Sequence, residues 1–73
     1  MKELKNRLAE IRKEQGITQQ QLADMIGMSR RYISSIEKNV SGISVTYALL
    51  IAHALGKEIE EIFYIENTEE ESE

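Results

Sequence analysis

Two neighbouring arginines, Arg30 and Arg31, are the residues of this 73-residue chain with the clearest capacity for recognition chemistry. They follow Ser29, a residue type that often caps the beginning of a helix, so both guanidinium groups are expected near a helix N-terminus. A guanidinium group donates two parallel hydrogen bonds, and the O6 and N7 acceptors of guanine in the DNA major groove match that geometry. The pattern therefore predicts a short helix that can contact base edges.

Residues suited to catalysis or metal binding are scarce. His53 is the one histidine and the chain has no cysteine, so a zinc site with several such ligands is not expected. A catalytic serine and carboxylate would have to gather around His53 in a cleft, for which a chain of this length has little volume. No glycine-rich phosphate loop is present. We therefore expect neither an enzyme nor a protein that holds a metal or cofactor.

The charged residues are distributed unevenly along the chain, whose formal net charge is -4. Residues 1–39 carry eight Lys or Arg against five Asp or Glu, whereas residues 40–73 carry one Lys against eight Glu. The basic half fits a surface that faces a polyanion, because neutralising phosphates requires Lys and Arg. The acidic end fits a solvated tail, and we expect residues 66–73 to be disordered.

Five helices are predicted from apolar residues at helical spacing and from the residue types that begin and end helices. Thr18 and Gln21 form a capping-box pattern, and Ser29 and Ser44 are further N-cap candidates. The predicted helices span residues 2–15, 18–26, 29–37, 44–55 and 58–62. After them, Phe63, Tyr64 and Ile65 have a higher propensity for strand than for helix.

The second and third predicted helices meet the requirements of a helix-turn-helix. Gly27 and Met28 join them, Ala23 is small enough for close approach, and Gly27 stands where a positive φ is favoured. The shared apolar seam consists of Leu22, Ile26, Met28, Ile33 and Ile36. The exposed positions of the third helix are then Arg30, Arg31, Tyr32, Ser34 and Ser35.

The run from Ile17 to Glu37 resembles the Cro and phage-repressor (XRE-like) helix-turn-helix family. The resemblance extends from about Leu8 to Phe63, and includes Ala54-Leu55-Gly56 and the closing run that ends at Phe63. It implies an all-α, compact, five-helix domain like that of lambda repressor over residues 1–65, with the helix-turn-helix at about 18–37. It also implies a DNA-binding transcriptional regulator that binds operator DNA as a dimer.

The resemblance assigns roles to individual positions. Gln19 would contact phosphate or the edge of the site, and Ser29 would hold the DNA backbone. In the third helix, the residues that would face bases are Arg30, Arg31 and Ser35, and Ser34 lies on the same exposed face. Tyr32 would contact base methyls or phosphate. Lys38 and Asn39 would lie against the sugar-phosphate chain beyond the helix. Arg12 and Glu37 stand where many members of the family have a structural ion pair.

The chain departs from the family pattern after the third helix. Asn39 replaces the usual glycine, and Gly42-Ile43-Ser44 stands in place of Asn-Pro-Ser. Because Asn tolerates a left-handed conformation, the exit from the third helix can survive this replacement. Loss of the proline makes the loop less rigid, so its phosphate contacts are the least secure of those assigned.

A homodimer is expected, with two groups of residues as its contacts. Leu50 is an apolar residue on the face that Tyr47 and His53 share, where it is either covered by a partner or a surface singleton. Phe63, Tyr64 and Ile65 either pack on the core as a frayed end or form a strand that pairs with its copy across a two-fold axis.

The leading hypothesis is therefore a dimeric repressor that inserts residues 29–37 into the major groove of a pseudo-palindromic operator in double-stranded DNA. An antitoxin or a restriction-modification controller fits the same residues, as does an interaction module that binds a protein partner through the acidic C-terminal half. The charged N-terminus has no apolar core of a signal peptide, and no run is long enough to cross a membrane, so we expect a cytoplasmic protein.

Overall fold

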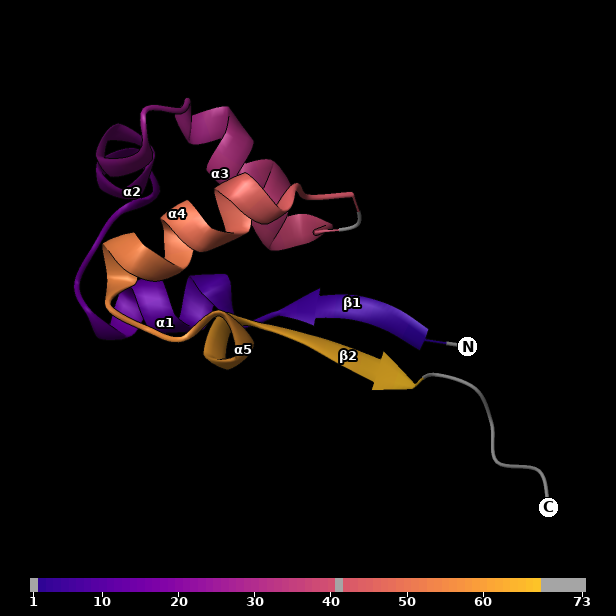
Figure 1. The fold of residues 1–73 in the computed structure, drawn as a ribbon. Coiled ribbons are helices and arrows are strands. Elements are labelled where there is room, and N and C mark those ends of the chain that lie inside the picture. The colour runs from indigo at the N-terminus through magenta and orange to yellow at the C-terminus, as the bar shows by residue number, and fades with distance from the viewer. Residues whose placement is uncertain (1, 41, 68–73) are drawn as a thin grey trace, which may run out of the picture.

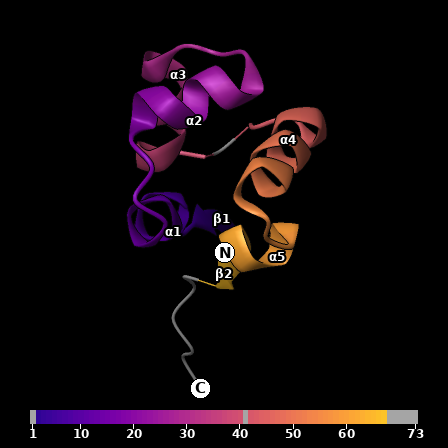
Figure 2. The ribbon, with the colours of Figure 1, turned by 90° about the vertical axis from the view of Figure 1, so that its left-hand side faces the viewer.

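The computed structural model describes residues 2–40 and 42–67. Its elements are β1 (Lys2–Asn6), α1 (Leu8–Glu14), α2 (Gln19–Ile26), α3 (Arg30–Lys38), α4 (Val45–Leu55), α5 (Ile59–Ile62) and β2 (Phe63–Asn67). The helices form the body of the molecule, and β1 and β2 form a two-stranded arm, the β arm, that projects from it (Figure 1). In Figure 2, α1, α2 and α3 lie on one side of the body and α4 and α5 on the other. The predicted five-helix fold is confirmed, with the addition of a short sheet.

The caps predicted from the sequence begin three of the helices. The Thr18 hydroxyl accepts a hydrogen bond from the Gln21 N–H at 3.0 Å, and the Gln21 side chain accepts one from the Thr18 N–H at 2.8 Å. Ser29 and Ser44 each accept a hydrogen bond from the backbone N–H three residues later. These bonds satisfy N–H groups that have no partner within the helix. The helices predicted at 18–26, 29–37, 44–55 and 58–62 agree with α2 to α5 to within one residue at each end.

The prediction of one helix over residues 2–15 is wrong in its first part. Residues 2–6 form β1, and α1 begins only at Leu8. The Asn6 side-chain oxygen accepts a hydrogen bond from the Leu8 N–H at 2.9 Å, so it supplies a partner for an otherwise free donor at the start of the helix. The spacing of Leu4 and Leu8 is helical, but an apolar residue at position 4 serves a strand equally well. The strand forms because β2, from the other end of the chain, pairs with it.

The β arm is antiparallel, with a register that runs from Lys2 opposite Asn67 to Asn6 opposite Phe63. The strand propensity of residues 63–65 is thus realised, but the partner of this strand lies in the same chain. Residues 66 and 67 belong to β2, so the tail predicted from residue 66 is wrong at those two positions. Residues 68–73 of the predicted tail lie outside the described residues.

Each helix contributes one large, fully buried aliphatic side chain to a single core, and these are Leu8, Leu22, Ile33, Ile51 and Ile62. Full burial of a side chain of this size stabilises the folded state by about 1.5–3 kcal/mol. Phe63 is also buried, and Leu4 packs against the core, so the base of the β arm is anchored in it. Among the described residues, every helix is too short or too polar to span a bilayer.

Candidate nucleic-acid interface

The turn between α2 and α3 depends on a small residue and on a glycine. Ala23 is completely buried where the two helices approach each other, and its carbonyl accepts a hydrogen bond from the Met28 N–H at 2.9 Å. Gly27 has a φ of +73°, which L side chains rarely adopt, although an added Cβ would meet no atom within 4 Å. Glycine is required here by backbone conformation and not by space. The turn fixes α3 across the end of α2.

Most of the polar residues predicted to face DNA lie on the outer side of α3. Arg30, Arg31, Ser35 and Lys38 are exposed, whereas Tyr32 and Ser34 are half-buried. Ser29 is exposed, but its hydroxyl is already the N-cap of α3 and accepts from the Tyr32 N–H at 3.1 Å. The helix therefore presents two arginines from its first turn and a lysine from its last turn, so cations lie at both ends of its exposed face.

Arg12 and Glu37 join α1 to the end of α3. Nε of Arg12 lies 2.7 Å from Oε2 of Glu37, and the two side chains are only 9% and 10% exposed. Nη2 of Arg12 donates a second bond to Oε1 of Glu37 at 3.3 Å, and Nη1 donates to the carbonyl of Ile17 at 2.9 Å. This geometry is bidentate, and the third bond satisfies another donor of the buried guanidinium group. The ion pair fixes the far end of α3 against the body.

Gln19 extends this pair to the other end of α3. Its side-chain nitrogen donates to Oε1 of Glu37 at 2.9 Å, and its side-chain oxygen accepts from Nη1 of Arg30 at 3.2 Å. The first residue of α2 thus bridges the last turn and the first residue of α3. Gln19 is half-buried. Four side chains from three helices form one connected polar network, which orients the Arg30 guanidinium group.

Comparison with known proteins identifies the architecture built by these residues. A family model described as helix-turn-helix matches residues 8–62. The chain belongs to the XRE-type helix-turn-helix family. It is 43% identical over 60 residues to an uncharacterised HTH-type transcriptional regulator of Methanothermobacter thermautotrophicus, covering 81% of this chain and 87% of the relative. The uncharacterised HTH-type regulator YgzD of Bacillus subtilis is 32% identical over 63 residues, covering 86% of this chain and 96% of the relative.

Two further comparisons agree with this family and fold. An uncharacterised HTH-type transcriptional regulator of Methanocaldococcus jannaschii is 39% identical over 66 residues, which cover 90% of this chain and 100% of the relative. A solved crystal structure of a protein from Bacteroides fragilis superimposes with a TM-score of 0.75 at 24% identity, covering 84% of this chain and 98% of that chain. At that identity the likeness shows the fold alone.

The exit of α3 in this helix-turn-helix protein does not use the left-handed conformation that Asn39 could tolerate. Asn39 has φ -154° and ψ 106°, which is an extended conformation. Its N–H donates to the carbonyl of Ser35 at 2.9 Å, so it still closes the last turn of α3. Among the described residues of the loop, Gly42 has a positive φ, of +87°. Gly42 can hold this conformation because it has no Cβ to oppose it.

Tyr32 of the helix-turn-helix faces α4 as well as the exposed side. Its ring packs edge-on against that of Tyr47, with centroids 5.4 Å apart. Burial raises the pKa of the Tyr32 hydroxyl above its usual value, and Tyr47 adds to the increase. The two tyrosines border a cleft of about 300 Å³ between α3 and α4, which Asn39 and Ser44 also line. Tyr32, which the sequence predicts to contact DNA, therefore also packs α3 against α4.

The residues predicted for the dimer contact have different surroundings. Phe63 is only 8% exposed and belongs to the core of its own chain, whereas Leu50 is 40% and Ile65 is 59% exposed. The Tyr64 ring lies under the guanidinium carbon of Arg7, at 4.2 Å from the ring centroid. Leu50 and Ile65 thus remain accessible to a partner, Tyr64 is engaged within its own chain, and Phe63 is largely covered.

Asn6 is a residue whose role the sequence did not indicate. Its side-chain nitrogen donates to the carbonyl of Ile36 at 3.1 Å, so it ties the base of the β arm to the last turn of α3. A single Asn in a polar, charged segment carries no distinctive pattern, and the two partners are 30 residues apart. Within residues 2–40 and 42–67, no group of three or more His, Cys, Asp or Glu is arranged to hold a metal ion.

Proposed function

We propose that this XRE-type helix-turn-helix regulator is a repressor that binds a pseudo-palindromic operator as a homodimer and inserts α3 into the major groove. Its relatives are named as HTH-type transcriptional regulators, which supports DNA binding and regulation in general. The observation that carries the finer proposal is the position of Arg30 and Arg31, both exposed on the first turn of a helix that the turn at Gly27 sets outward.

The proposed contacts follow from the geometry of α3. Arg30 and Arg31 would donate to guanine O6 and N7, with Ser34, Ser35 and Tyr32 beside them on the same helix. Lys38 and Asn39, at the other end of the helix, would bind phosphate and sugar, which position the protein without reading sequence. Ser29 and Gln19 lie at the N-termini of α3 and α2, where backbone N–H groups favour an anion. The homodimer would place two copies of α3 about one turn of DNA apart.

Selection from a random duplex DNA library at near-physiological salt tests this proposal. We expect enrichment of a two-fold symmetric site with half-sites about 10 base pairs apart. Arg30→Ala and Arg31→Ala should each relax discrimination at one position per half-site by about 1–3 kcal/mol. The matched control is Lys57→Ala, a cation in the loop between α4 and α5, at the opposite end of the body from α3 (Figure 1).

The outcomes separate the parts of the proposal. Retention of DNA without any enriched sequence contradicts base recognition, and an enriched site without symmetry contradicts the dimer. If both arginine variants keep the sequence preference of the unmodified protein, the assignment of α3 residues to bases is wrong. A protein that retains no DNA favours the alternative of a protein partner.

A further inference from the structure

The β arm has two strands and therefore two outer edges. Each strand of a two-stranded sheet pairs on one side only, so its other side can accept a further strand. The arm projects beyond the helices, so neither edge is enclosed by the helical body along its whole length (Figure 1). The proposed homodimer raises the question of which edge, if either, meets a second copy.

The outer edge of β1 borders an open groove. This groove, of about 530 Å³, lies between β1 and the last turn and exit of α3, where residues 37–40 form its other wall, and Tyr64 of β2 also lines it. The Asn6 bond to the carbonyl of Ile36 at 3.1 Å holds the strand and the helix in this relation. The edge of β1 is therefore open to the groove, and a further strand can pair with such an edge.

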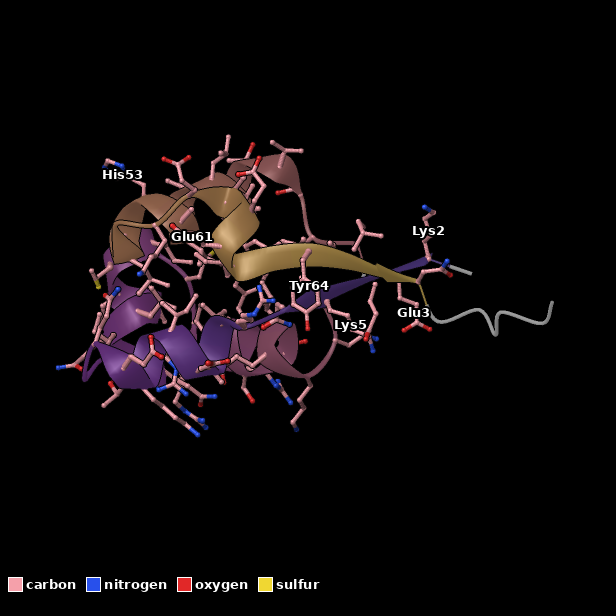
Figure 3. The ribbon with its side chains drawn as sticks, turned by 90° about the horizontal axis from the view of Figure 1, so that it is seen from below. Lys2, Glu3, Lys5, His53, Glu61 and Tyr64 are labelled. Atoms are coloured by element: carbon pink, nitrogen blue, oxygen red, sulfur yellow. The ribbon has the colours of Figure 1, made fainter. Side chains whose placement is uncertain are left out.

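The charges along β1 are complementary to those of an antiparallel copy. Lys5 Nζ and Glu3 Oε1 are 3.1 Å apart, half-exposed, and project to the same side of the strand, opposite to Lys2 (Figure 3). When two β1 strands pair antiparallel about Leu4, Glu3 lies opposite Lys5 of the partner subunit, and Lys5 opposite Glu3 of the partner subunit. Opposite charges at directly paired positions stabilise a sheet. The charges of Glu3 and Lys5 therefore favour pairing of β1 with the β1 strand of a second copy.

The outer edge of β2 has no such charge complementarity. Glu66 is the one charged residue of this strand. Antiparallel pairing of two β2 strands about Ile65 would place Glu66 opposite Tyr64 of the partner subunit. This edge therefore lacks the facing opposite charges that favour self-pairing at β1.

The apolar residues of the β arm are compatible with pairing at β1. Leu4 is opposite Ile65 in the register of the β arm, and Ile65 is 59% exposed. If two β1 strands pair about Leu4, the sheet has the order β2, β1, β1 of the partner, β2 of the partner. Ile65 and Leu4 of both copies then form one continuous apolar row across four strands, so each Leu4 gains an apolar neighbour from the partner subunit. Pairing of two β2 strands about Ile65 would form an equivalent row, so the choice of edge depends on the charges.

We propose that two copies of this chain associate through antiparallel pairing of their β1 strands about Leu4, forming a four-stranded sheet across the two-fold axis. This inference rests on the homodimer of the proposed function and specifies its contact. It moves the pairing from residues 63–65, the segment that the sequence favours, to the strand that lies beside them. Ile65 then stands one strand further from the axis than Leu4.

Cysteine cross-linking tests the pairing, because the chain has no native cysteine. In Leu4→Cys the two Cα atoms would be about 4.5–5.5 Å apart, within the range that a disulfide spans. We expect this variant to form a covalent dimer under mild oxidation without DNA. The matched control is Ile65→Cys, whose copies would be three strand spacings apart, about 14 Å, and would stay uncross-linked.

Charge exchange provides a second measurement that leaves Leu4 intact. Glu3→Lys should raise the dissociation constant of the dimer about ten-fold in sedimentation equilibrium, because each dimer then contains two facing Lys pairs. The double variant Glu3→Lys/Lys5→Glu should restore dimerisation. Because both residues are half-exposed, circular dichroism should show an unchanged fold in each variant.

Three results would overturn the inference. Cross-linking by Ile65→Cys but not by Leu4→Cys would assign the contact to β2. A dimer that neither cysteine cross-links, and that charge exchange leaves unaltered, would assign it to another face such as that of Leu50, while the homodimer of the proposed function stands. A chain that stays monomeric at all concentrations contradicts the β1 contact, and symmetric sites in the DNA selection would then show that the homodimer of the proposed function still stands.

Discussion

The side-chain oxygen of Gln19 accepts a hydrogen bond from Nη1 of Arg30 at 3.2 Å, which joins the first residue of α2 to the first residue of α3. The other end of the same amide donates to Glu37, whose carboxylate is held by Arg12. An arginine on an exposed helix surface otherwise samples many rotamers, and their loss on binding costs affinity. The network restricts Arg30 before DNA is present.

Gln19→Ala is expected to weaken binding to the selected operator about ten-fold, in keeping with the loss of one or two hydrogen bonds, and to weaken binding to random DNA much less. The measurement is fluorescence anisotropy with both DNAs at one salt concentration. Gln20→Ala is the control, because the Gln20 side chain donates to Asp24 of its own helix and is exposed. An equal loss on both DNAs would instead support the phosphate contact expected from the sequence.

Glu37→Gln is expected to lower the free energy of unfolding by about 3–5 kcal/mol, because it leaves the buried charge of Arg12 without its partner. Urea unfolding followed by circular dichroism measures this change. Glu14→Gln, an exposed position on α1, should stay within about 0.5 kcal/mol of the unmodified protein. A loss in Glu37→Gln as small as that expected for Glu14→Gln would mean that the ion pair is not a significant source of stability.

Lys38→Ala is expected to weaken binding to operator and random DNA alike. Lys38 is exposed at the end of α3, where we assign it to phosphate. Loss of one phosphate contact should reduce the slope of log K against log salt by about 1, with base preference unchanged. Binding titrations at several salt concentrations measure this slope, with Lys57→Ala as the control. A slope equal to that of the unmodified protein would exclude Lys38 from the DNA contact.

Stability at high pH is expected to depend on Tyr32. Its folded pKa is raised by burial, so the unfolded chain loses this proton at a lower pH than the folded chain. The corresponding stabilisation is complete below the ordinary tyrosine pKa and is lost as the pH rises through the raised folded value. The stability of Tyr32→Phe relative to the unmodified protein should therefore increase from about pH 9 to about pH 11. This range extends about one pH unit to each side of the ordinary tyrosine pKa. Urea unfolding across this range gives the difference, and a constant difference would contradict the burial effect.

Much of the helical fold was predictable because its signals are local. Thr18, Ser29 and Ser44 cap helices through bonds to residues three positions away, so the capping pattern is visible in a short stretch of sequence. The positive φ of Gly27 likewise follows from the absence of a side chain at that residue. These elements place Arg30 and Arg31 on an outward-facing helix with no knowledge of the rest of the chain.

The remaining features depend on segments that are distant in the sequence. Residues 2–6 have helical spacing with Leu8, yet they form a strand because β2 pairs with them from the opposite end of the chain. The partners of Gln19 and Asn6 lie 18 and 30 residues away, and a polar side chain does not reveal a distant partner. Asn39 is extended, and the positive φ lies at Gly42, three residues further along the chain. Sequence alone determined the four helices α2 to α5 and the exposure of Arg30 and Arg31. Tertiary packing decided the β arm and the network that orients Arg30, because hydrogen-bond pairing between distant segments is settled only when the core brings them together.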